Sequence, residues 1–311
     1  MKGRILVLGS SNVDLILRVP RFHAPGETII GENLVTAFGG KGANQAIAAK
    51  RLGGEVRFLT KLGKDSFGRS YREYLIQNRM PPHFLLQDPK LPTGVAVIEL
   101  SPGGENRIIV SPGANGALSV KDLECHRGIW EGVTVFVAQL ETPLNVVNKG
   151  LTMARKNGSL TILNPAPAIP LSHKVLSLVD FLIPNEWEAQ ILSGMKISEK
   201  RDVSRVAQEL LRQGAKNVVI TLGADGLYFR NRLEEVRMKA FRVKVADTTA
   251  AGDAFMGAFA SSLAAGKPIP EALHRANAAG ALAATKLGAQ PSLPHRKDLE
   301  KFLKNAKWDR P

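Results

Sequence analysis

The stretch of the chain with the clearest chemical potential is a run of small and acidic residues before an apolar helical pattern at 255–265. This run reads Asp247-Thr248-Thr249-Ala250-Ala251-Gly252-Asp253. Small residues before a helix leave its first N–H groups unhindered at the positive end of the helix dipole, which favours phosphate. Asp253 would lie at the mouth of this anion site and could accept a proton from a substrate hydroxyl during phosphoryl transfer. It could equally be a favourable acidic residue of a first helical turn.

A second glycine-rich stretch lies near the N-terminus and reads Phe38-Gly39-Gly40-Lys41-Gly42-Ala43-Asn44-Gln45-Ala46. Its glycines would let the backbone approach a small ligand, while Lys41 and Asn44 offer donors beside it. Lys41 could instead be a solvated residue at a helix start. Asn12 and Asp14 follow the first expected strand, where ligands bind in parallel α/β proteins, although both could be turn caps.

The phosphate-binding device is neither a P-loop nor a dinucleotide fingerprint, because the chain has no Gly-x-x-x-x-Gly-Lys-Ser/Thr and no Gly-x-Gly-x-x-Gly stretch. A glycine-bounded turn at 221–226 follows one expected strand and leads into another. Such a turn at the end of a strand would suit close approach by a nucleotide. As a lone hairpin turn it would indicate no function.

The elements that would position these residues follow from short β-branched runs separated by helical spacing of apolar residues. The clearest expected strands are 4–9, 133–138, 160–164, 181–183, 217–221 and 227–230, and the clearest expected helices are 43–52, 143–157, 203–213 and 269–287. Regular alternation of strand and helix predicts a mostly parallel sheet with helices on both faces, which is a doubly wound α/β fold.

Two segments break this alternation and contain strands with no helix between them. They cover residues 14–38 and 93–110, the second with a turn at 101–105. Antiparallel strands outside the main sheet predict a small β-sheet lid that could close over a ligand and exclude water. We therefore expect a single domain over residues 1–311, with a lid formed by about 12–40 and 93–113.

The composition favours a soluble protein of the reducing cytoplasm. The 311 residues are 44% apolar, which is enough for a sizeable core. The single cysteine, Cys125, excludes an internal disulfide, and six scattered histidines suggest no zinc site. The apolar run at 5–8 is too short for a signal peptide. No run of about 18 apolar residues occurs in the sequence, so we expect no membrane span and no membrane partner.

The charge of the chain raises the alternative of a nucleic-acid binder. Lys and Arg number 42 against 28 Asp and Glu, which gives a formal net charge of +14. The basic residues are dispersed, however, and aromatic residues make up only 6% of the chain, so no stacking platform for bases is indicated. We expect no nucleic-acid partner. The excess of positive charge could steer anionic nucleotide toward a cleft, but a plain solvated basic surface is the favoured interpretation.

The two glycine-rich stretches together resemble the two signatures of the ribokinase-like carbohydrate kinases. Either stretch alone could occur by chance, whereas both in this order and at this separation could not plausibly do so. The resemblance runs from 8–14 to 288–292 and includes Pro25-Gly26-Glu27-Thr28, Ser111-Pro112-Gly113-Ala114-Asn115, Asn164-Pro165-Ala166-Pro167 and Pro184-Asn185-Glu186. One departure is Ala251, which we place where the second signature usually has glycine.

This resemblance implies that the protein transfers the γ-phosphate of ATP to a sugar hydroxyl, with Asp253 as the base. The implied anion hole is Ala250, Ala251 and Gly252, and the implied sugar ligands are Asn12, Asp14, Gly40, Lys41, Asn44, Glu141 and Asp253. Glu141 could instead be an acid at a helix start. The expected reaction converts D-ribose to D-ribose 5-phosphate. A kinase for another sugar or a nucleoside, and a catalytically silent sugar-binding regulator, remain alternatives.

The resemblance also implies a nucleotide site and two metal ions. The implied ATP ligands are Asn185, Thr221, Gly223, Gly226, Gly252 and Asn277. Asn185 and Glu188 resemble an Asn-x-x-Glu pair that organises Mg²⁺ through water, which suits an ion that keeps much of its hydration. The same two residues would suit a helix capping box, and both roles can hold together.

A monovalent cation, usually potassium, is implied beside the anion hole. Its matching positions are Asp247, Thr249, Ala283, Lys286, Gly288 and Ser292. The resemblance further implies a homodimer through the lid, since exposed edge strands often pair with a second subunit.

Overall fold

The computed structural model describes residues 3–103 and 105–305, and within them the largest element is a nine-stranded sheet. The strand order is β13-β12-β11-β10-β9-β8-β1-β4-β5. Only the β11–β12 and β12–β13 pairs of the described sheet are antiparallel. The strands are β1 (Arg4–Leu8), β4 (Glu55–Gly63), β5 (Leu85–Asp88), β8 (Val133–Ala138), β9 (Leu160–Leu163), β10 (Phe181–Leu182), β11 (Asn217–Thr221), β12 (Leu227–Arg230) and β13 (Glu235–Met238).

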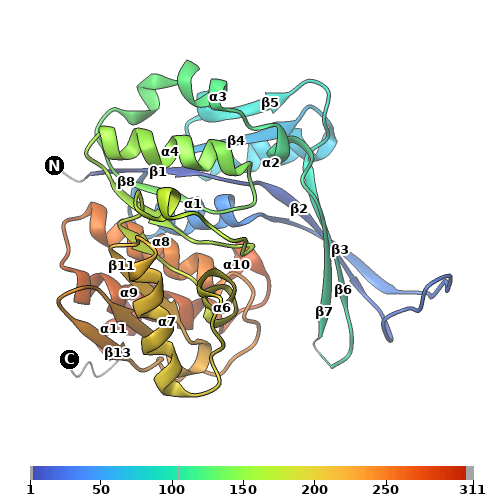
Figure 1. Ribbon diagram of the computed structural model, residues 1–311. Helices are drawn as coiled ribbons and strands as arrows, with labels where there is room; N and C mark the ends of the chain where they lie inside the picture. The colour runs from blue at the N-terminus through green and yellow to red at the C-terminus, as the bar shows by residue number, and fades with distance from the viewer. Residues whose placement is uncertain (1–2, 104, 306–311) are drawn as a thin grey trace.

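Helices cover both faces of this sheet, as Figure 1 shows. They are α1 (Lys41–Arg51), α2 (Ser66–Gln77), α3 (Val120–Cys125), α4 (Leu144–Lys156), α5 (His173–Leu176), α6 (Glu186–Ser193), α7 (Lys200–Arg212), α8 (Ala251–Ala264), α9 (Ile269–Ala283), α10 (Ala289–Ser292) and α11 (Arg296–Asn305). Four short 3₁₀ turns, η1 (Pro82–Phe84), η2 (Gly113–Ala117), η3 (Arg127–Trp130) and η4 (Gly223–Asp225), complete the elements of the described chain.

The alternation of side chains along β1 shows how the two layers form. Ile5 and Val7 pack into one core cluster with α1, α2, α8, α9 and α11, whereas Leu6 and Leu8 pack into a second cluster with α3, α4, α6 and α7. Successive side chains of a strand point to opposite faces, so a strand buried on both sides must be apolar throughout. The predicted doubly wound α/β fold is confirmed.

A separate small sheet has the order β3-β2-β6-β7 in the described part of the chain. It consists of β2 (Asn12–Arg18), β3 (Glu32–Gly39), β6 (Gly94–Leu100) and β7 (Asn106–Ser111). Figure 1 shows it projecting beyond the helical layers. The expected strands are present, but the central β2–β6 pair is parallel rather than antiparallel, because both strands leave the body in the same direction from Asn12 and Gly94. The expected turn at 101–105 includes residue 104, which lies outside the described residues.

The helix boundaries that differ most from the predictions are the start of α8 and the end of α9. α8 begins at Ala251 rather than near 255. The apolar pattern missed its first turn because that turn is built of small residues, which carry no apolar periodicity. α9 ends at Ala283 rather than 287. Beyond it the N–H groups of Thr285 and Lys286 make only the tight turn hydrogen bonds of a helix end, and Gly288 has a φ of 81° that a right-handed helix cannot contain.

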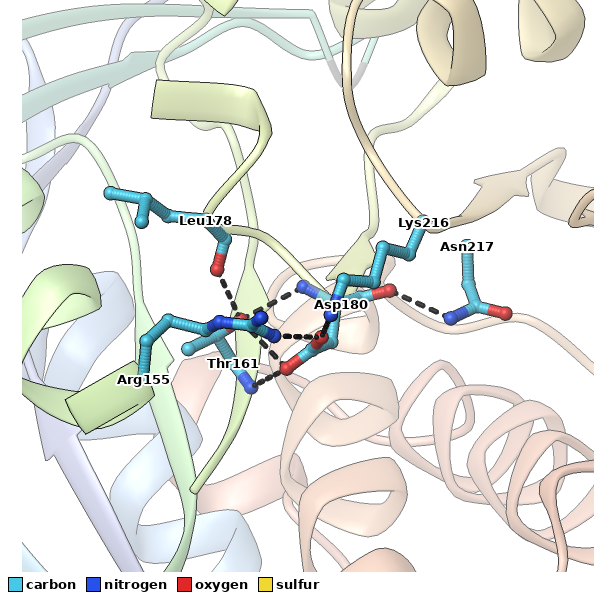
Figure 2. Close-up of polar contacts among 6 residues, drawn as sticks. All are labelled: Arg155, Thr161, Leu178, Asp180, Lys216 and Asn217. Carbon is cyan, nitrogen blue, oxygen red and sulfur yellow. Dashed lines mark hydrogen bonds and ion pairs between the residues drawn. The ribbon is translucent and has the colours of Figure 1, made fainter. Parts of the chain in front are cut away.

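A buried carboxylate ties three strands together at their amino ends, as Figure 2 shows. Asp180, just before β10, accepts a hydrogen bond from the Thr161 N–H of β9 at 2.9 Å. It also pairs with Arg155 of α4 at 2.8 Å and with Lys216, just before β11, at 2.7 Å. The Asn217 side chain donates to the Asp180 carbonyl at 2.8 Å. This cluster therefore fixes the register of β9, β10 and β11 at the edge opposite to their carboxyl ends.

None of the helices found in residues 3–103 and 105–305 combines the length and the hydropathy needed to span a bilayer.

Candidate active site

Asp253, in the first turn of α8, lies at the centre of a group of polar side chains at the carboxyl edge of the main sheet. The residue is only 7% exposed. One carboxylate oxygen accepts from Asn44 Nδ2 at 2.9 Å and the other from Gln45 Nε2 at 3.0 Å. Burial raises the pKa of the Asp253 carboxyl, although Lys41 and the two amides act in the opposite direction. The two amide donors stabilise the ionised form that a general base requires.

The backbone before Asp253 is shaped to offer N–H groups. Ala250 is the N-cap of α8 in the left-handed region, with a φ of 59°. The N–H of Ala251 donates to the Thr248 carbonyl at 3.1 Å. The N–H groups of Gly252 and Asp253 make no hydrogen bond with any described residue. Two donors at the positive end of α8 are therefore free for an anion, and the Ala251 N–H, which we had placed in the anion hole, is engaged.

This geometry corrects one expectation about the second signature. We had placed its usual glycine at Ala251, but Ala251 is helical and needs no glycine. The position with a positive φ, which favours glycine, is Ala250. The alanine therefore sits in a strained conformation one residue earlier than expected.

Asn12 and Asp14 enter the site from β2 of the small sheet. The side-chain oxygen Oδ1 of Asn12 accepts from Asn115 Nδ2 at 2.8 Å. The two Nδ2 hydrogens of Asn12 have no partner among the described residues and are left to donate. Asp14 packs over Gly39 so closely that a Cβ at that glycine would lie 2.1 Å from a carboxylate oxygen. Burial, followed by the charges of Glu141 and Asp253, raises the pKa of Asp14 to about 7.

The turn between β3 and α1 requires glycine at Gly40. Its φ is 89°, and a Cβ there would lie 2.7 Å from the Asn12 backbone nitrogen. Tyr71, on α2, donates its hydroxyl to the Gly39 carbonyl at 2.5 Å and so holds the turn from the other side. The close approach of this turn to β2 fixes where α1, which begins at Lys41, starts relative to the small sheet.

Glu141 follows β8 and faces the start of α1. One of its oxygens accepts from the Lys41 backbone N–H at 3.0 Å and from the hydroxyl of Ser10. Burial lowers the pKa of the Lys41 ammonium, but the carboxylates of Asp253 and Glu141 outweigh it, so the pKa is raised and the group stays charged. The site therefore contains one cation among several acids.

A pocket of about 220 Å³ lies beside Asp253, and its lining includes Lys41, Gly252, Asn185 and Glu188. Asn185 and Glu188 form the predicted capping box of α6: Glu188 N–H donates to Asn185 Oδ1 at 2.8 Å, and Asn185 N–H donates to Glu188 Oε2 at 2.8 Å. Burial raises the pKa of Glu188, against the effects of Asn185 and Lys41. Lys41, which we had placed with the sugar ligands, lies in this pocket with the capping box.

A second pocket of about 620 Å³ adjoins the first. The predicted nucleotide residues that line it are Thr221, Gly223, Gly226, Gly252 and Asn277, whereas Asn185 lines only the smaller pocket. Phe241, Val243, Val245 and Ala281 give it apolar walls. Thr221, Thr248, Gly252 and Phe255 line both pockets, so the two form one continuous space that ends at Asp253. A long cavity with an apolar end and a polar end suits a nucleotide.

The positions proposed for a monovalent cation lie on two segments joined by Asp247. One of its oxygens accepts from the Thr249 N–H at 2.8 Å, and the other accepts from the Gly288 N–H at 2.8 Å. Burial would raise the pKa of Asp247, but these hydrogen bonds lower it overall, so the group is ionised at neutral pH. Ala283 ends α9, Lys286 lies in the following turn, and Ser292 ends α10. Across the described ranges, no cluster of three or more His, Cys, Asp or Glu side chains could hold a metal.

Three amides at the site, of which Gln45 and Gln139 are buried and Asn164 is half-buried, were not predicted to have a role. Gln45 contacts Asp253 directly, Gln139 contacts Gln45, and Asn164 accepts a second hydrogen bond from Gln45 at 3.1 Å. Gln45 and Asn164 both lie in segments quoted for the family resemblance. The sequence signal that could have identified them is that both are polar residues inside those segments to which no ligand role was assigned.

The comparisons with known proteins agree with this geometry. Residues 2–296 match the pfkB family of carbohydrate kinases. A ribokinase from Haemophilus influenzae is 39% identical over 98% of this chain and 100% of that relative. A deoxyribokinase from Salmonella typhi is 34% identical over 96% of this chain and 98% of the relative.

Among solved structures, ribokinase from Arabidopsis thaliana complexed with ribose and ATP superposes with a TM-score of 0.90 at 32% identity, covering 98% of this chain and 100% of that one. Ribokinase from Thermotoga maritima has a TM-score of 0.89 at 36% identity, covering 97% and 100%. The family match spans nearly the whole chain and includes every residue of the site described above. The protein belongs to the pfkB family of carbohydrate kinases.

Proposed function

We propose that this protein phosphorylates D-ribose on its 5-hydroxyl with ATP, giving D-ribose 5-phosphate and ADP. The observation that carries the proposal is the position of Asp253. It is buried between two further acids, Asp14 of the small sheet and Glu141 after β8, and the pocket that continues toward Asn277. A base in this position can receive a hydroxyl proton on one side while the phosphoryl donor lies on the other.

The chain's own residues account for the steps of such a reaction. Asp253 accepts the proton of the attacking hydroxyl, and the free N–H groups of Gly252 and Asp253 donate to the transferring phosphoryl group. The Lys41 ammonium lies in the same small pocket and offsets negative charge there. Catalysis of phosphoryl transfer is mainly positioning and electrostatic stabilisation, so these groups suffice for the protein's part.

The larger pocket suits the nucleotide. Its apolar walls, including Phe241 and Val243, suit the adenine of ATP. Asn277 also lines this pocket, and its side chain donates to the Lys239 carbonyl at 2.8 Å. Gly226 must be glycine, since a Cβ would lie 2.0 Å from the Met238 carbonyl oxygen. Gly223, by contrast, has open space where a Cβ would lie, which supports close approach of a ligand to the turn at 221–226.

Two metal ions complete the proposal. Asn185 and Glu188 fit Mg²⁺ bound through water, because each Glu188 oxygen keeps a lone pair after accepting from Asn185, and the pair lines the small pocket. When bound, Mg²⁺ would neutralise phosphate charge. An ionised Asp247 that joins the Thr249 and Gly288 segments fits a potassium ion, so we expect KCl to raise activity above that in tetramethylammonium chloride of equal ionic strength.

The sugar side favours a substrate with several hydroxyls. Asn12 offers donors, and ionised Asp14 offers acceptors for two neighbouring hydroxyls. Because a buried acceptor left without its hydroxyl is penalised, such a site rejects analogues that lack one. Relatives named ribokinase and deoxyribokinase both match this chain, so the 2-hydroxyl is the feature to test.

The whole chain would act as one domain, with the small sheet (about 12–40 and 93–113) as its lid. Both edge strands of this sheet, β3 and β7, carry exposed apolar side chains, including Leu34, Ile108 and Ile109. We propose that a second copy covers them, giving a homodimer through the lid, and that the enzyme works in the cytoplasm.

Replacing the base tests the function. Asp253→Asn keeps the size and a hydrogen-bonding side chain but removes the proton acceptor, so turnover of ribose should fall by at least about a thousandfold while ribose binding stays nearly intact. The measurements are coupled ADP release and calorimetric ribose binding. Asp202→Asn, on the distant helix α7, is the matched control and should keep wild-type turnover.

A substrate panel tests the sugar. Radiolabelled ATP is offered with ribose, deoxyribose, fructose and adenosine, and ribose should have the highest kcat/KM. A preference for another member of the panel would replace ribose as the substrate while leaving the kinase intact. Absence of transfer to any of them, with ribose still bound, would favour the silent regulator.

A further inference from the structure

We propose that Gln45 is a positioning residue that orients the catalytic carboxylate of Asp253 and stabilises its ionised form, and that Gln139 sets the orientation of the Gln45 amide. This inference rests on the proposed function, in which Asp253 is the base. It concerns how the base is held, and not which sugar is phosphorylated.

Gln45 lies at the centre of a chain of three amides, with buried Gln139 on one side and half-buried Asn164 on the other. Its Nε2 donates one hydrogen to Asp253 Oδ1 at 3.0 Å and the other to Asn164 Oδ1 at 3.1 Å. Its Oε1 accepts from Gln139 Nε2 at 2.6 Å. Asn164 in turn donates to the Ile183 carbonyl at 3.0 Å. Gln45 and Gln139 are each no more than 1% exposed, so water does not compete for these contacts.

The direction of this chain fixes which end of the Gln45 amide faces the carboxylate. An amide has one donating and one accepting end. Because Gln139 presents its N–H₂ group, Gln45 must turn its oxygen toward Gln139 and its own N–H₂ group toward Asp253. A reversed Gln45 would place its oxygen against the oxygens of Asp253 and Asn164, and its N–H₂ group against that of Gln139. Gln139 therefore acts on Asp253 through Gln45.

The orientation of the Gln139 amide leaves its own oxygen without a hydrogen bond to any described residue. Its Oε1 is buried without a hydrogen-bond partner among the described residues. The same oxygen lies against Gly9, where a Cβ would approach it to 2.1 Å. A buried amide oxygen without a partner destabilises the fold, and such groups in native structures call for an explanation. Orientation of the Gln45 amide supplies one.

Asn44 cannot replace Gln45 in this role. It also donates to Asp253, but it has a buried oxygen without a partner and is the residue expected to bind the sugar hydroxyls. When a sugar engages Asn44, Gln45 remains as the amide donor to Asp253 whose other contacts are all to protein side chains. Gln45 would then hold the carboxylate while the hydroxyl proton is transferred.

The consequence is a defined effect on the pH dependence of turnover. Hydrogen bonds to the ionised form lower the pKa of a carboxyl, so losing the Gln45 donor should raise that of Asp253. The other ionisable groups around Asp253 are Lys41 on α1, Asp14 on β2, Glu141 after β8 and Glu188 on α6. The pH profile of kcat is the readout, because in the ternary complex Asp14 is occupied by sugar.

The test compares Gln45→Met with wild type in ribose phosphorylation from pH 5.5 to 9. The acid limb of kcat should move up by about one pH unit, and kcat on the plateau should fall roughly tenfold or more, while KM for ribose changes less than about twofold. Gln139→Met should move the limb in the same direction by less. Gln190 lies on α6, and its side-chain oxygen accepts from the Ile197 N–H. Gln190→Met therefore controls for loss of a side-chain hydrogen bond and should leave the acid limb in place.

An unmoved acid limb in Gln45→Met, or a loss carried by KM for ribose, overturns the inference. If Gln45→Met does not fold, as judged by its thermal transition, Gln139→Met decides the question by the same criterion. Failure of the proposed function has a different signature: wild type then does not phosphorylate ribose, or Asp253→Asn turns over normally. An active wild type, an inactive Asp253→Asn and a normal Gln45→Met would refute the role of Gln45 alone.

Discussion

Two carboxylates of the site, Asp14 and Asp253, differ in what surrounds them. Asp253 accepts from two amides, whereas the Asp14 carboxylate makes no hydrogen bond to a described residue and faces the charges of Glu141 and Asp253. An empty sugar site thus leaves Asp14 with a pKa of about 7. Its ionised form is the one that can accept from two sugar hydroxyls. Sugar binding and proton release should therefore be coupled at this residue.

We expect ribose to bind more tightly as pH rises from 5.5 to 8, by up to about tenfold per pH unit below 7. Calorimetry in buffers of different ionisation enthalpy should detect release of close to one proton near pH 6. Asp14→Asn should weaken binding and flatten this dependence. A steep dependence that persists in Asp14→Asn would assign the proton to another group.

The same shift affects stability with the opposite sense. The folded pKa of Asp14, about 7, lies above the ordinary value of 3.8, so the native state binds more protons than the unfolded chain between these pH values. Stability contributed by this group is therefore lost as pH rises through that window. Ribose should offset the loss, because it binds only the native state.

Ala250 gives a prediction with opposite signs at neighbouring residues. Because its φ of 59° disfavours a residue with a Cβ, Ala250→Gly should raise the free energy of unfolding by roughly 0.5–1 kcal/mol. Ala251 is helical, so Ala251→Gly should lower it by roughly the same amount. Urea denaturation of the two variants measures both. Equal signs would contradict the assignment of the strained position.

At the scale of elements, α1 organises the site. Its N-terminal turn places the Lys41 N–H on Glu141, and its second turn places Asn44 and Gln45 on Asp253. α8 crosses α1 at Gly257, where a Cβ would lie 2.4 Å from Ala48 Cβ. The close crossing of these two helices sets the distance between base and amides.

How much of this could be predicted follows from how local each signal is. β8 has the predicted bounds, and the capping box of Asn185 and Glu188 was predicted, because both rest on residues close in sequence. The pairing of Gln45 with Gln139 joins residues 94 apart in the chain and depends on how α1 packs at the end of β8. The strained position at Ala250 likewise needed backbone angles, which residue types alone do not give.

The Asp180 cluster makes a prediction for the sheet itself. Asp180→Ala removes the acceptor for Thr161 and leaves Arg155 and Lys216 without their partner, so it should lower the free energy of unfolding by about 3 kcal/mol. Lys216→Met should cost about 1 kcal/mol or less, because Lys216 is half exposed and Arg155 remains. Denaturant titration gives both values. Turnover of folded Asp180→Ala should be unchanged, since the cluster lies at the opposite edge of the sheet from Asp253.

On the scale of the whole molecule, the small sheet has two duties that depend on each other. It carries Asn12 and Asp14 into the site, yet it projects from the body, as Figure 1 shows. Apolar side chains on its edge strands β3 and β7 are exposed. A sheet that supplies ligands must hold its position, and a thin projecting sheet packed against little else is poorly restrained. Pairing with a second copy would bury its apolar surface and restrain the sugar ligands together.

Ile109 on the edge strand β7 is the residue to change, because its side chain is 71% exposed and a carboxylate there would be buried in the proposed interface. Light scattering coupled to size-exclusion chromatography should show a dimer for wild type and a monomer for Ile109→Glu at about 10 μM. Leu233→Glu adds the same charge at a residue that is 95% exposed, in the turn between β12 and β13, and should remain a dimer. KM for ribose should rise in Ile109→Glu and not in Leu233→Glu, since only the first frees the sheet that carries Asp14. A monomeric wild type, or a dimeric Ile109→Glu with unchanged KM, would show that the lid is restrained by the body of its own subunit.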